Sequence, residues 1–239
     1  MKLDRRVYDK YLDSRYSQIH RFDKKEYKRF KKGYEANYGR FLPQDKNSKI
    51  LDIGCGTGFF LYYLKEKRYK NFYGIDISKD QIDYCRQKIT KNVVHADAFE
   101  FLRDKIEEYD VIVMNDLLEH IPEEKLIEFL SKLVYKALRP RGIVIIKTPN
   151  MANPFGLISR YCDLTHKTGF TESSLYQLLK VCGFKEIKLY PTKSTYTFKF
   201  AIGGIVRYLV HLWLKFLFLV QGYTVPKILT MNLIATARK

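Results

Sequence analysis

Cysteine is scarce and scattered in this sequence. The four cysteines are too far apart and too irregularly spaced for a zinc site, and they do not form the framework of a small disulfide-rich secreted domain. We therefore interpret Cys55, Cys85, Cys162 and Cys182 as reduced, mostly structural thiols.

The first residues lack an apolar run. Met1 to Lys10 is rich in charge and has no hydrophobic segment of the kind that forms the core of a Sec-type signal peptide. There are also no internal repeats and no low-complexity tracts. We predict a cytoplasmic protein, with peripheral attachment to the inner face of the membrane as a further hypothesis.

Acidic residues are the minority among the charges. Lys and Arg number 43 against 26 Asp and Glu, a formal net charge of +17, and no acidic residue follows Glu186. Such a chain attracts anionic partners, which include nucleic acid, phospholipid and phosphorylated substrates. The charge alone does not choose among them.

The length of 239 residues, with 46% hydrophobic residues, suits one catalytic domain, which we place at 47–239. Residues 1–46 form a basic segment with tyrosines at roughly helical spacing, at positions 8, 11, 16, 27, 34 and 38. Two interpretations of this segment stay open. It is a helix pair that lies over a cofactor cleft, or it is a surface for an anionic substrate.

Short apolar runs alternate with amphipathic ones along the rest of the chain. The expected strands are 50–53, 72–77, 93–96, 111–115, 143–148, 184–190 and 231–236, and the expected helices between them are 59–67, 79–88, 123–138 and 171–182. This alternation predicts a doubly wound α/β fold with a mostly parallel seven-stranded sheet, the Rossmann-like arrangement. In such sheets, ligands bind outside the carboxyl ends of the strands.

The segment from Phe200 to Val220 differs from the rest. Its only ionisable residues are Arg207, His211 and Lys215, which fall on one face of a helix. We predict a carboxyl-terminal amphipathic helical insertion that lies in a membrane interface, because each basic charge at the centre of a bilayer costs about 2.5–3.5 kcal/mol. A dimer interface or a lid over the substrate pocket are the alternatives.

A glycine-rich turn follows the first strand, in the run Asp52-Ile53-Gly54-Cys55-Gly56-Thr57-Gly58. Its G-x-G-x-G spacing lets a ligand approach the backbone, and Phe59 replaces the third glycine of the dinucleotide fingerprint. Asp76 ends the second strand, where a carboxylate can accept hydrogen bonds from a ribose. Asp97, with Ala98 and Phe99, ends the third strand and suits an adenine.

These motifs, with Y-D-V-I-V-M-N-D-L-L-E-H-I and L-R-P-R-G-I-V-I-I-K-T-P-N further on, resemble those of class I methyltransferases that depend on S-adenosyl-L-methionine (SAM). The resemblance implies SAM as the cofactor and S-adenosyl-L-homocysteine as its product. It implies that the methionine end of SAM lies against the glycine turn, the ribose against the second strand, the adenine against the third, and the sulfonium beside the fourth. The cofactor-binding residues expected in this way are Asp52, Gly54, Cys55, Gly56, Gly58, Asp76, Ile77, Asp97, Ala98 and Asn115.

Two histidines are placed to reach the same rim of the sheet. His120 follows the fourth strand, and Asp163 and His166 follow the fifth. A histidine that titrates near neutrality suits removal of a proton from an alcohol acceptor, so we predict catalytic roles for His166, His120 and Asp163. The alternative is that they only organise turns. We expect no metal site, because Asp163 and His166 alone are too few ligands.

The downstream motifs look like those of quinone-biosynthesis O-methyltransferases and of methyltransferases for bacterial surface polysaccharides. This resemblance implies O-methylation of an anionic or lipid-linked saccharide acceptor, with an anionic membrane surface and a second copy of the chain as further partners. A small-molecule quinone-precursor O-methyltransferase is the nearest alternative. An RNA methyltransferase is disfavoured because Asn115 precedes Asp-Leu-Leu and not a double-proline aromatic motif. A non-catalytic module is disfavoured by the intact cofactor motifs.

Overall fold

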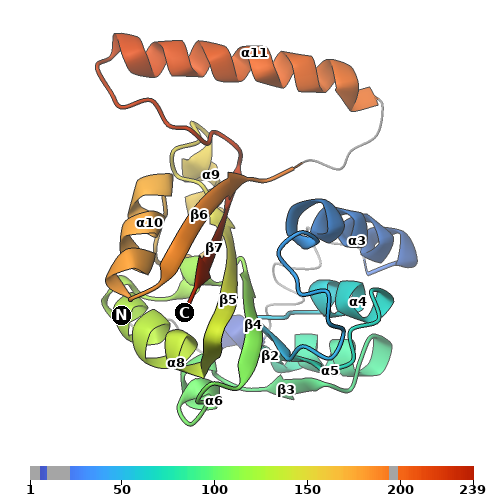
Figure 1. The fold of residues 1–239 in the computed structure, drawn as a ribbon. Helices are drawn as coiled ribbons and strands as arrows, with labels where there is room; N and C mark the ends of the chain where they lie inside the picture. Colours follow the sequence, from blue (N-terminus) through green and yellow to red (C-terminus); the bar gives the residue numbers. More distant parts are fainter. Residues whose placement is uncertain (1–5, 10–21, 194–198) are drawn as a thin grey trace.

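A single seven-stranded sheet with helices on both faces organises the protein in this computed structural model, which describes residues 6–9, 22–193 and 199–239 (Figure 1). The strand order is β3-β2-β1-β4-β5-β7-β6. The strands are β1 (Ile50–Ile53), β2 (Phe72–Asp76), β3 (Val93–His95), β4 (Tyr109–Asn115), β5 (Leu138–Pro149), β6 (Lys185–Pro191) and β7 (Asn232–Arg238). The predicted doubly wound α/β fold is confirmed.

The sheet is parallel from β3 to β5, and β7 runs antiparallel to both β5 and β6. All four residues of β1 are buried, because helices cover both faces of the centre of the sheet. The chain builds outward from β1 to β3 and then crosses to β4 on the other side of β1. This reversal between β1 and β4 opens a crevice at their carboxyl ends, which is where ligands bind in open α/β sheets.

The helices connect the strands and pack on the two faces. They are α1 (Arg6–Asp9), α3 (Lys24–Tyr38), α4 (Phe59–Glu66), α5 (Lys79–Lys88), α6 (Ala98–Leu102), α7 (Glu123–Ile127), α8 (Tyr135–Ala137), α9 (Gly156–Tyr161), α10 (Glu172–Val181) and α11 (Lys199–Val220), with a 3₁₀ turn η2 (Leu118–His120) and a π-helical stretch η3 (Glu128–Val134). Helices α6 and α9 are absent from the sequence prediction, since neither is long enough to show a period.

The fifth strand begins earlier than predicted. β5 starts at Leu138, which pairs with Tyr109 before a register shift in the ladder, whereas the sequence predicted a helix up to this residue and a strand only from Ile143. Pro140 hid this part of the strand, because proline cannot donate to a ladder. An ion pair at 2.8 Å between Arg139 and Asp110 joins the two strands here.

Helix α3 joins the main core through aromatic rings. Phe30 stacks on Phe59 of α4 with 4.1 Å between ring centroids, and the Tyr27 hydroxyl donates to the carbonyl of Thr57 at 2.9 Å. Tyr27 and Tyr38 are buried in the same hydrophobic cluster as β1 and α4. These tyrosines therefore pack the domain. Tyr11 and Tyr16 of the predicted segment lie outside the described residues.

Helix α11 is an insertion between β6 and β7 that extends away from the sheet (Figure 1). Its apolar side chains are largely exposed, with Trp213 59% and Leu219 67% accessible. His211 and Lys215 of the predicted polar stripe are half-buried, and the side chain of Arg207 lies outside the described part. Among the described helices, none combines the length and the hydropathy that crossing a bilayer requires.

Candidate active site

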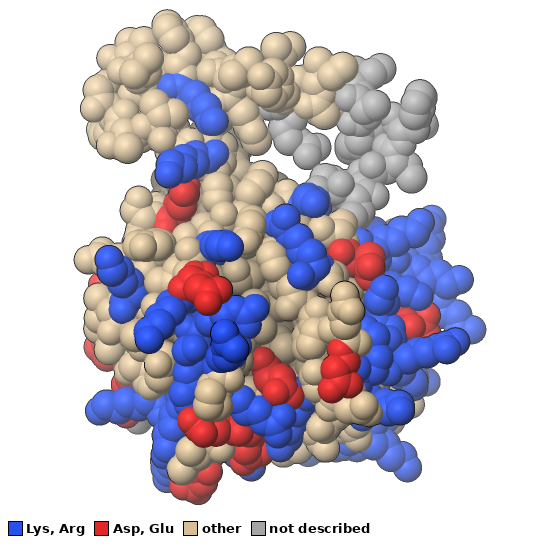
Figure 2. All heavy atoms as spheres, viewed as in Figure 1, with Lys and Arg blue, Asp and Glu red and all other residues tan. Residues whose placement is uncertain are grey.

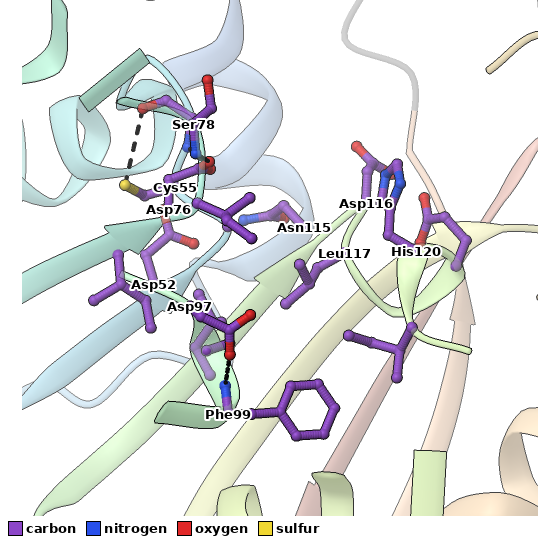
Figure 3. Close-up of a pocket in the computed structure, with 18 of the residues that line it drawn as sticks. Asp52, Cys55, Asp76, Ser78, Asp97, Phe99, Asn115, Asp116, Leu117 and His120 are labelled. Atoms are coloured by element: carbon purple, nitrogen blue, oxygen red, sulfur yellow. Dashed lines mark hydrogen bonds between the residues drawn. The ribbon is translucent and has the colours of Figure 1, made fainter. Parts of the chain in front are cut away.

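A cleft of about 1920 Å³ opens at the carboxyl ends of the parallel strands. This exceeds the space that a single small ligand needs, which is typically about 300–1,000 Å³, so a cofactor and an acceptor can share it. Of the thirteen residues predicted for the site, twelve line the cleft: Asp52, Gly54, Cys55, Gly56, Asp76, Ile77, Asp97, Ala98, Asn115, His120, Asp163 and His166. Figure 3 shows the acidic residues of β1 and β2 at one end and Asp116 with His120 at the other.

Gly58 is the predicted site residue that does not line the cleft. Its φ of 85° and its position at the start of α4 require glycine, and a Cβ there would lie 2.4 Å from the Sγ of Cys85. Gly58 thus serves the packing of α4 against α5. Gly54, with φ 74°, does face the cleft, where an added Cβ would meet Leu117 at 3.0 Å.

Asp76 ties the glycine turn to the end of β2. One carboxylate oxygen accepts the Gly56 amide and the other accepts the Ser78 amide, both at 2.8 Å. Burial raises the pKa of Asp76, although both hydrogen bonds act in the opposite direction. Each oxygen keeps a second lone pair, so the carboxylate can still accept hydrogen bonds from two ribose hydroxyls.

Asp52 and Asn115 present unpaired polar atoms to the cleft. Asp52 Oδ1 and Asn115 Nδ2 are buried without a hydrogen-bond partner. The Tyr38 hydroxyl donates to Asn115 Oδ1 at 2.5 Å, which fixes the orientation of the amide. Burial, followed by the charge of Asp76, raises the pKa of Asp52 well above its ordinary value of 3.8, although the nearby side-chain amide of Asn115 acts in the opposite direction. A buried acceptor without a partner is costly, so this one suits a cationic ligand group.

Asp97 caps helix α6 at the third strand. Its Oδ1 accepts the backbone amides of Phe99 at 2.8 Å and Glu100 at 3.2 Å (Figure 3). The sequence assigned this carboxylate to an adenine amino group. One of its oxygens is used by the cap, which leaves the other for that contact.

The two predicted histidines meet at the other end of the cleft, with 4.8 Å between their ring centroids. The Thr165 hydroxyl donates to Asp163 at 2.5 Å, so its oxygen accepts the His120 Nδ1–H at 2.8 Å. His166 Nδ1 donates to the carbonyl of Ser159 at 2.8 Å. In the neutral form of each ring, the free lone pair is therefore on Nε2.

The surroundings keep His120 neutral. Burial, followed by the proximity of His166, lowers the pKa of His120 to about 4. Thr165 is the residue that joins Asp163 to His120. Asp163 and Thr165 thus belong to a hydrogen-bonded chain that ends at His120.

Glu119 is a site residue that the sequence analysis missed. It is only 2% exposed and lines the cleft, its Oε2 accepts the Thr148 hydroxyl at 3.0 Å, and its Oε1 has no partner. Burial, followed by the charge of Asp116, raises the pKa of Glu119 to about 8. Its place directly before His120 was the available signal, which we interpreted as a turn.

A ligand with a cationic amino acid end and a nucleoside end fits this geometry. The unpaired oxygen of Asp52 suits the cation, the carboxylate of Asp76 suits ribose hydroxyls, and Asp97 with the apolar Phe99 suits a base. SAM has these three parts in this order. The site defines a SAM-dependent methyltransferase.

The comparisons with known proteins agree. A family model described as "Methyltransferase domain" matches residues 23–189, and the chain belongs to this family. It is 27% identical over 152 residues to phosphoethanolamine N-methyltransferase of Plasmodium falciparum, covering 60% of this chain and 56% of that protein. It is 36% identical over 112 residues to the ubiquinone biosynthesis O-methyltransferase of Pelagibacter ubique, covering 44% of this chain and 43% of that protein. The chain thus spans about half the length of these relatives.

A solved structure supports the same assignment. The crystal structure of a SAM-dependent methyltransferase from Archaeoglobus fulgidus superposes with a TM-score of 0.62 at 27% identity, covering 84% of this chain and 90% of that one. The chain is therefore a SAM-dependent methyltransferase, and SAM is its cofactor.

Proposed function

We propose that the protein methylates a hydroxyl oxygen of an anionic or lipid-linked saccharide at a membrane surface, as a step in building a bacterial surface polymer. The observation that carries the membrane part is the shared position of two exposed apolar surfaces. Helices α9 and α11 lie at the same end of the molecule (Figure 1).

The surface around α9 borders the end of the cleft that contains His120 and His166, where we place the acceptor. Ser159 and Cys162 line the cleft, while the neighbouring Leu157, Tyr161 and Leu164 are 68%, 75% and 81% exposed. Helix α11 adds an almost uncharged surface above a body rich in Lys and Arg (Figure 2). An apolar helix face that lies in the headgroup region, with basic residues near anionic lipids at about 1 kcal/mol each, would hold the enzyme beside a lipid-linked substrate.

The histidine pair supports an oxygen acceptor. Bound SAM supplies a methyl group that leaves with its bonding electrons kept by sulfur, while a hydroxyl acceptor gives up its proton. His166 presents an Nε2 lone pair at the end of the cleft away from Asp52 and Asp76, where it would accept that proton, while the weakly basic His120 would accept a hydrogen bond from the hydroxyl and orient it. Thr165 and Asp163 would hold His120 in the productive tautomer.

Two alternatives are less well supported. The lid interpretation of α11 finds no support, since none of its described residues lines the cleft. An RNA acceptor is disfavoured because Tyr27 and Tyr38, which would stack on bases, are buried in the core.

A methyl-transfer screen tests the acceptor. Purified protein is incubated with labelled SAM and with lipid-linked oligosaccharides, nucleotide sugars, catechol-type quinone precursors or RNA. We expect label on a saccharide oxygen. Transfer only to the phenols would replace the saccharide by a quinone precursor, and transfer only to RNA would reject O-methylation of a saccharide.

Vesicle flotation tests the membrane part. We expect recovery with vesicles that contain phosphatidylglycerol and less with phosphatidylcholine alone. Trp213→Glu on α11 should abolish recovery, and Ile106→Glu, which changes an equally exposed residue before β4, should not. Equal behaviour of the two variants, or a dimer in sedimentation that Trp213→Glu dissociates in the absence of lipid, would reject lipid as the partner of α11.

A further inference from the structure

We propose that Glu119, His120 and His166 bind one divalent transition-metal cation, with a coordination position left open for the acceptor hydroxyl. One ligand atom from each of these residues lies within 4.8 Å of the others. The sequence predicted no metal site, because Asp163 and His166 alone are too few ligands. The structure gathers a different set, from η2 and from the loop after α9.

Both imidazoles are held in an orientation that suits binding of a cation. Each Nδ1–H is held by an oxygen, His120 by Thr165 and His166 by the carbonyl of Ser159, so each Nε2 lone pair is left free in the cleft. Histidines that bind metals typically donate their other N–H to such an oxygen, which fixes the tautomer and the orientation of the ring. The Asp163 carboxylate behind Thr165 extends this support for His120.

Glu119 is a second and independent sign of a missing partner. Its carboxyl group is buried, one oxygen is held by Thr148, and the other, Oε1, has no hydrogen-bond partner. No ion pair to Glu119 is formed within the described ranges, because the nearby Lys147 pairs with Asp116 at 2.5 Å. A cation between Oε1 and the two Nε2 atoms would be the missing partner of Oε1. Its positive charge would also balance the buried carboxylate.

The donor set indicates the class of cation. Two imidazoles and one carboxylate are typical of Zn²⁺, Fe²⁺, Mn²⁺ or Co²⁺ sites, whereas Mg²⁺ and Ca²⁺ prefer oxygen ligands. Ligand bonds of about 2.0–2.2 Å would require the three side chains to close by small rotations from their present separation. Three protein ligands leave room for water or substrate, as in metal sites that act on a bound molecule.

The role of the cation depends on the proposed O-methylation, whereas its binding does not. A hydroxyl bound to a divalent cation loses its proton to solvent more easily, so the cation would do what we assigned to the histidine pair. The acceptor oxygen would then be oriented by the cation at the end of the cleft away from Asp52. The histidines would act as ligands, and Thr165 and Asp163 as positioning residues.

Direct binding is the first test. Protein stripped with a chelator and freed of it by gel filtration is titrated with Co²⁺, and the visible absorption of the ion is recorded. We expect saturation near one equivalent, and competition by Zn²⁺ but not by Mg²⁺. Glu119→Gln and His166→Gln should weaken binding at least about 10-fold, and Thr165→Val, which removes support for His120, about 10- to 100-fold. His211→Gln on α11 is the matched control and should bind as the wild type does.

The outcomes separate the two proposals. Absence of a Co²⁺ spectrum in the wild type, or equal binding by His166→Gln and His211→Gln, overturns the metal site, and SAM titrations with the same samples show that the domain is folded. Undiminished methyl transfer by stripped protein overturns the role of the cation while O-methylation stands. A saturable site with no saccharide methylated overturns the acceptor assignment and leaves the metal site in place.

Discussion

Replacing Asp52 by Asn should stabilise the protein and weaken its hold on SAM. The carboxyl is fully buried, Oδ1 has no partner, and burial and Asp76 raise its pKa well above 3.8. A buried polar group left without a partner costs about 1–3 kcal/mol, and more when it is charged, so removal of the charge should raise the stability of the cofactor-free protein by about 1–2 kcal/mol. The lost contact to a cationic group should cost about 1.5–3 kcal/mol, a decrease of about 10- to 150-fold in SAM affinity.

The stability difference between Asp52→Asn and the wild type should depend on pH. A carboxyl whose pKa is raised by folding contributes stability below its unfolded pKa, and that contribution is lost as the pH rises through its folded pKa. The stability gap between Asp52→Asn and the wild type should therefore widen above pH 3.8. Binding of a cation favours the ionised carboxylate, so the SAM affinity of the wild type should rise over the same window while that of the variant changes less.

Urea unfolding at several pH values and calorimetry with SAM measure both effects. Asp104→Asn is the control, since Asp104 is exposed and does not line the cleft, so it removes the same charge elsewhere. A variant that is less stable than the wild type at neutral pH, or one that binds SAM with unchanged affinity, would refute the reasoning.

Three further outcomes follow from the same cleft. Asp76→Ala should weaken SAM binding at least several-fold in calorimetry, because the ribose loses its acceptor and two backbone amides lose theirs; unchanged affinity would contradict the assignment. Tyr38→Phe should lower the free energy of unfolding by about 1 kcal/mol and raise the KM for SAM, since the amide of Asn115 is no longer held. A loss of stability with an unchanged KM would show that Tyr38 and Asn115 do not act on the cofactor. Gly58→Ala should lower the melting temperature more than substitutions of residues that line the cleft, because the new methyl group collides with Cys85. A variant with an unchanged melting temperature would show that α4 and α5 can shift apart.

The sheet and the cofactor end could be predicted from the sequence because their signals are local. Asp52 is the penultimate residue of β1 and Asp76 the last residue of β2, and parallel strands bring their carboxyl ends to the same edge. The acceptor end is different. Glu119 becomes a buried, half-paired carboxylate only when Thr148 of β5 and His166 of a later loop pack against it, and no spacing in the sequence encodes that meeting.

The boundary errors have equally specific causes. Pro140 concealed the first residues of β5, although Leu138 pairs with Tyr109 of β4. Gly58 belongs to the glycine motif, yet its φ serves the junction of two helices and not the ligand. A motif thus identifies the neighbourhood of a ligand, while only the fold separates the residues that touch it from those that shape the turn.

The place where α11 leaves the sheet decides how far this helix can be altered without disturbing the sheet. Pro191 of β6 pairs with Leu233 of β7, so the two strands remain paired up to the connection that contains α11. Helix α11 can therefore change in length or hydropathy without altering the pairing of β6 with β7, whereas Ile228 and Leu229, which are buried on the way back to β7, have to be kept. A chimera in which a short polar turn replaces Lys199–Val220 should fold, bind SAM and stay off vesicles.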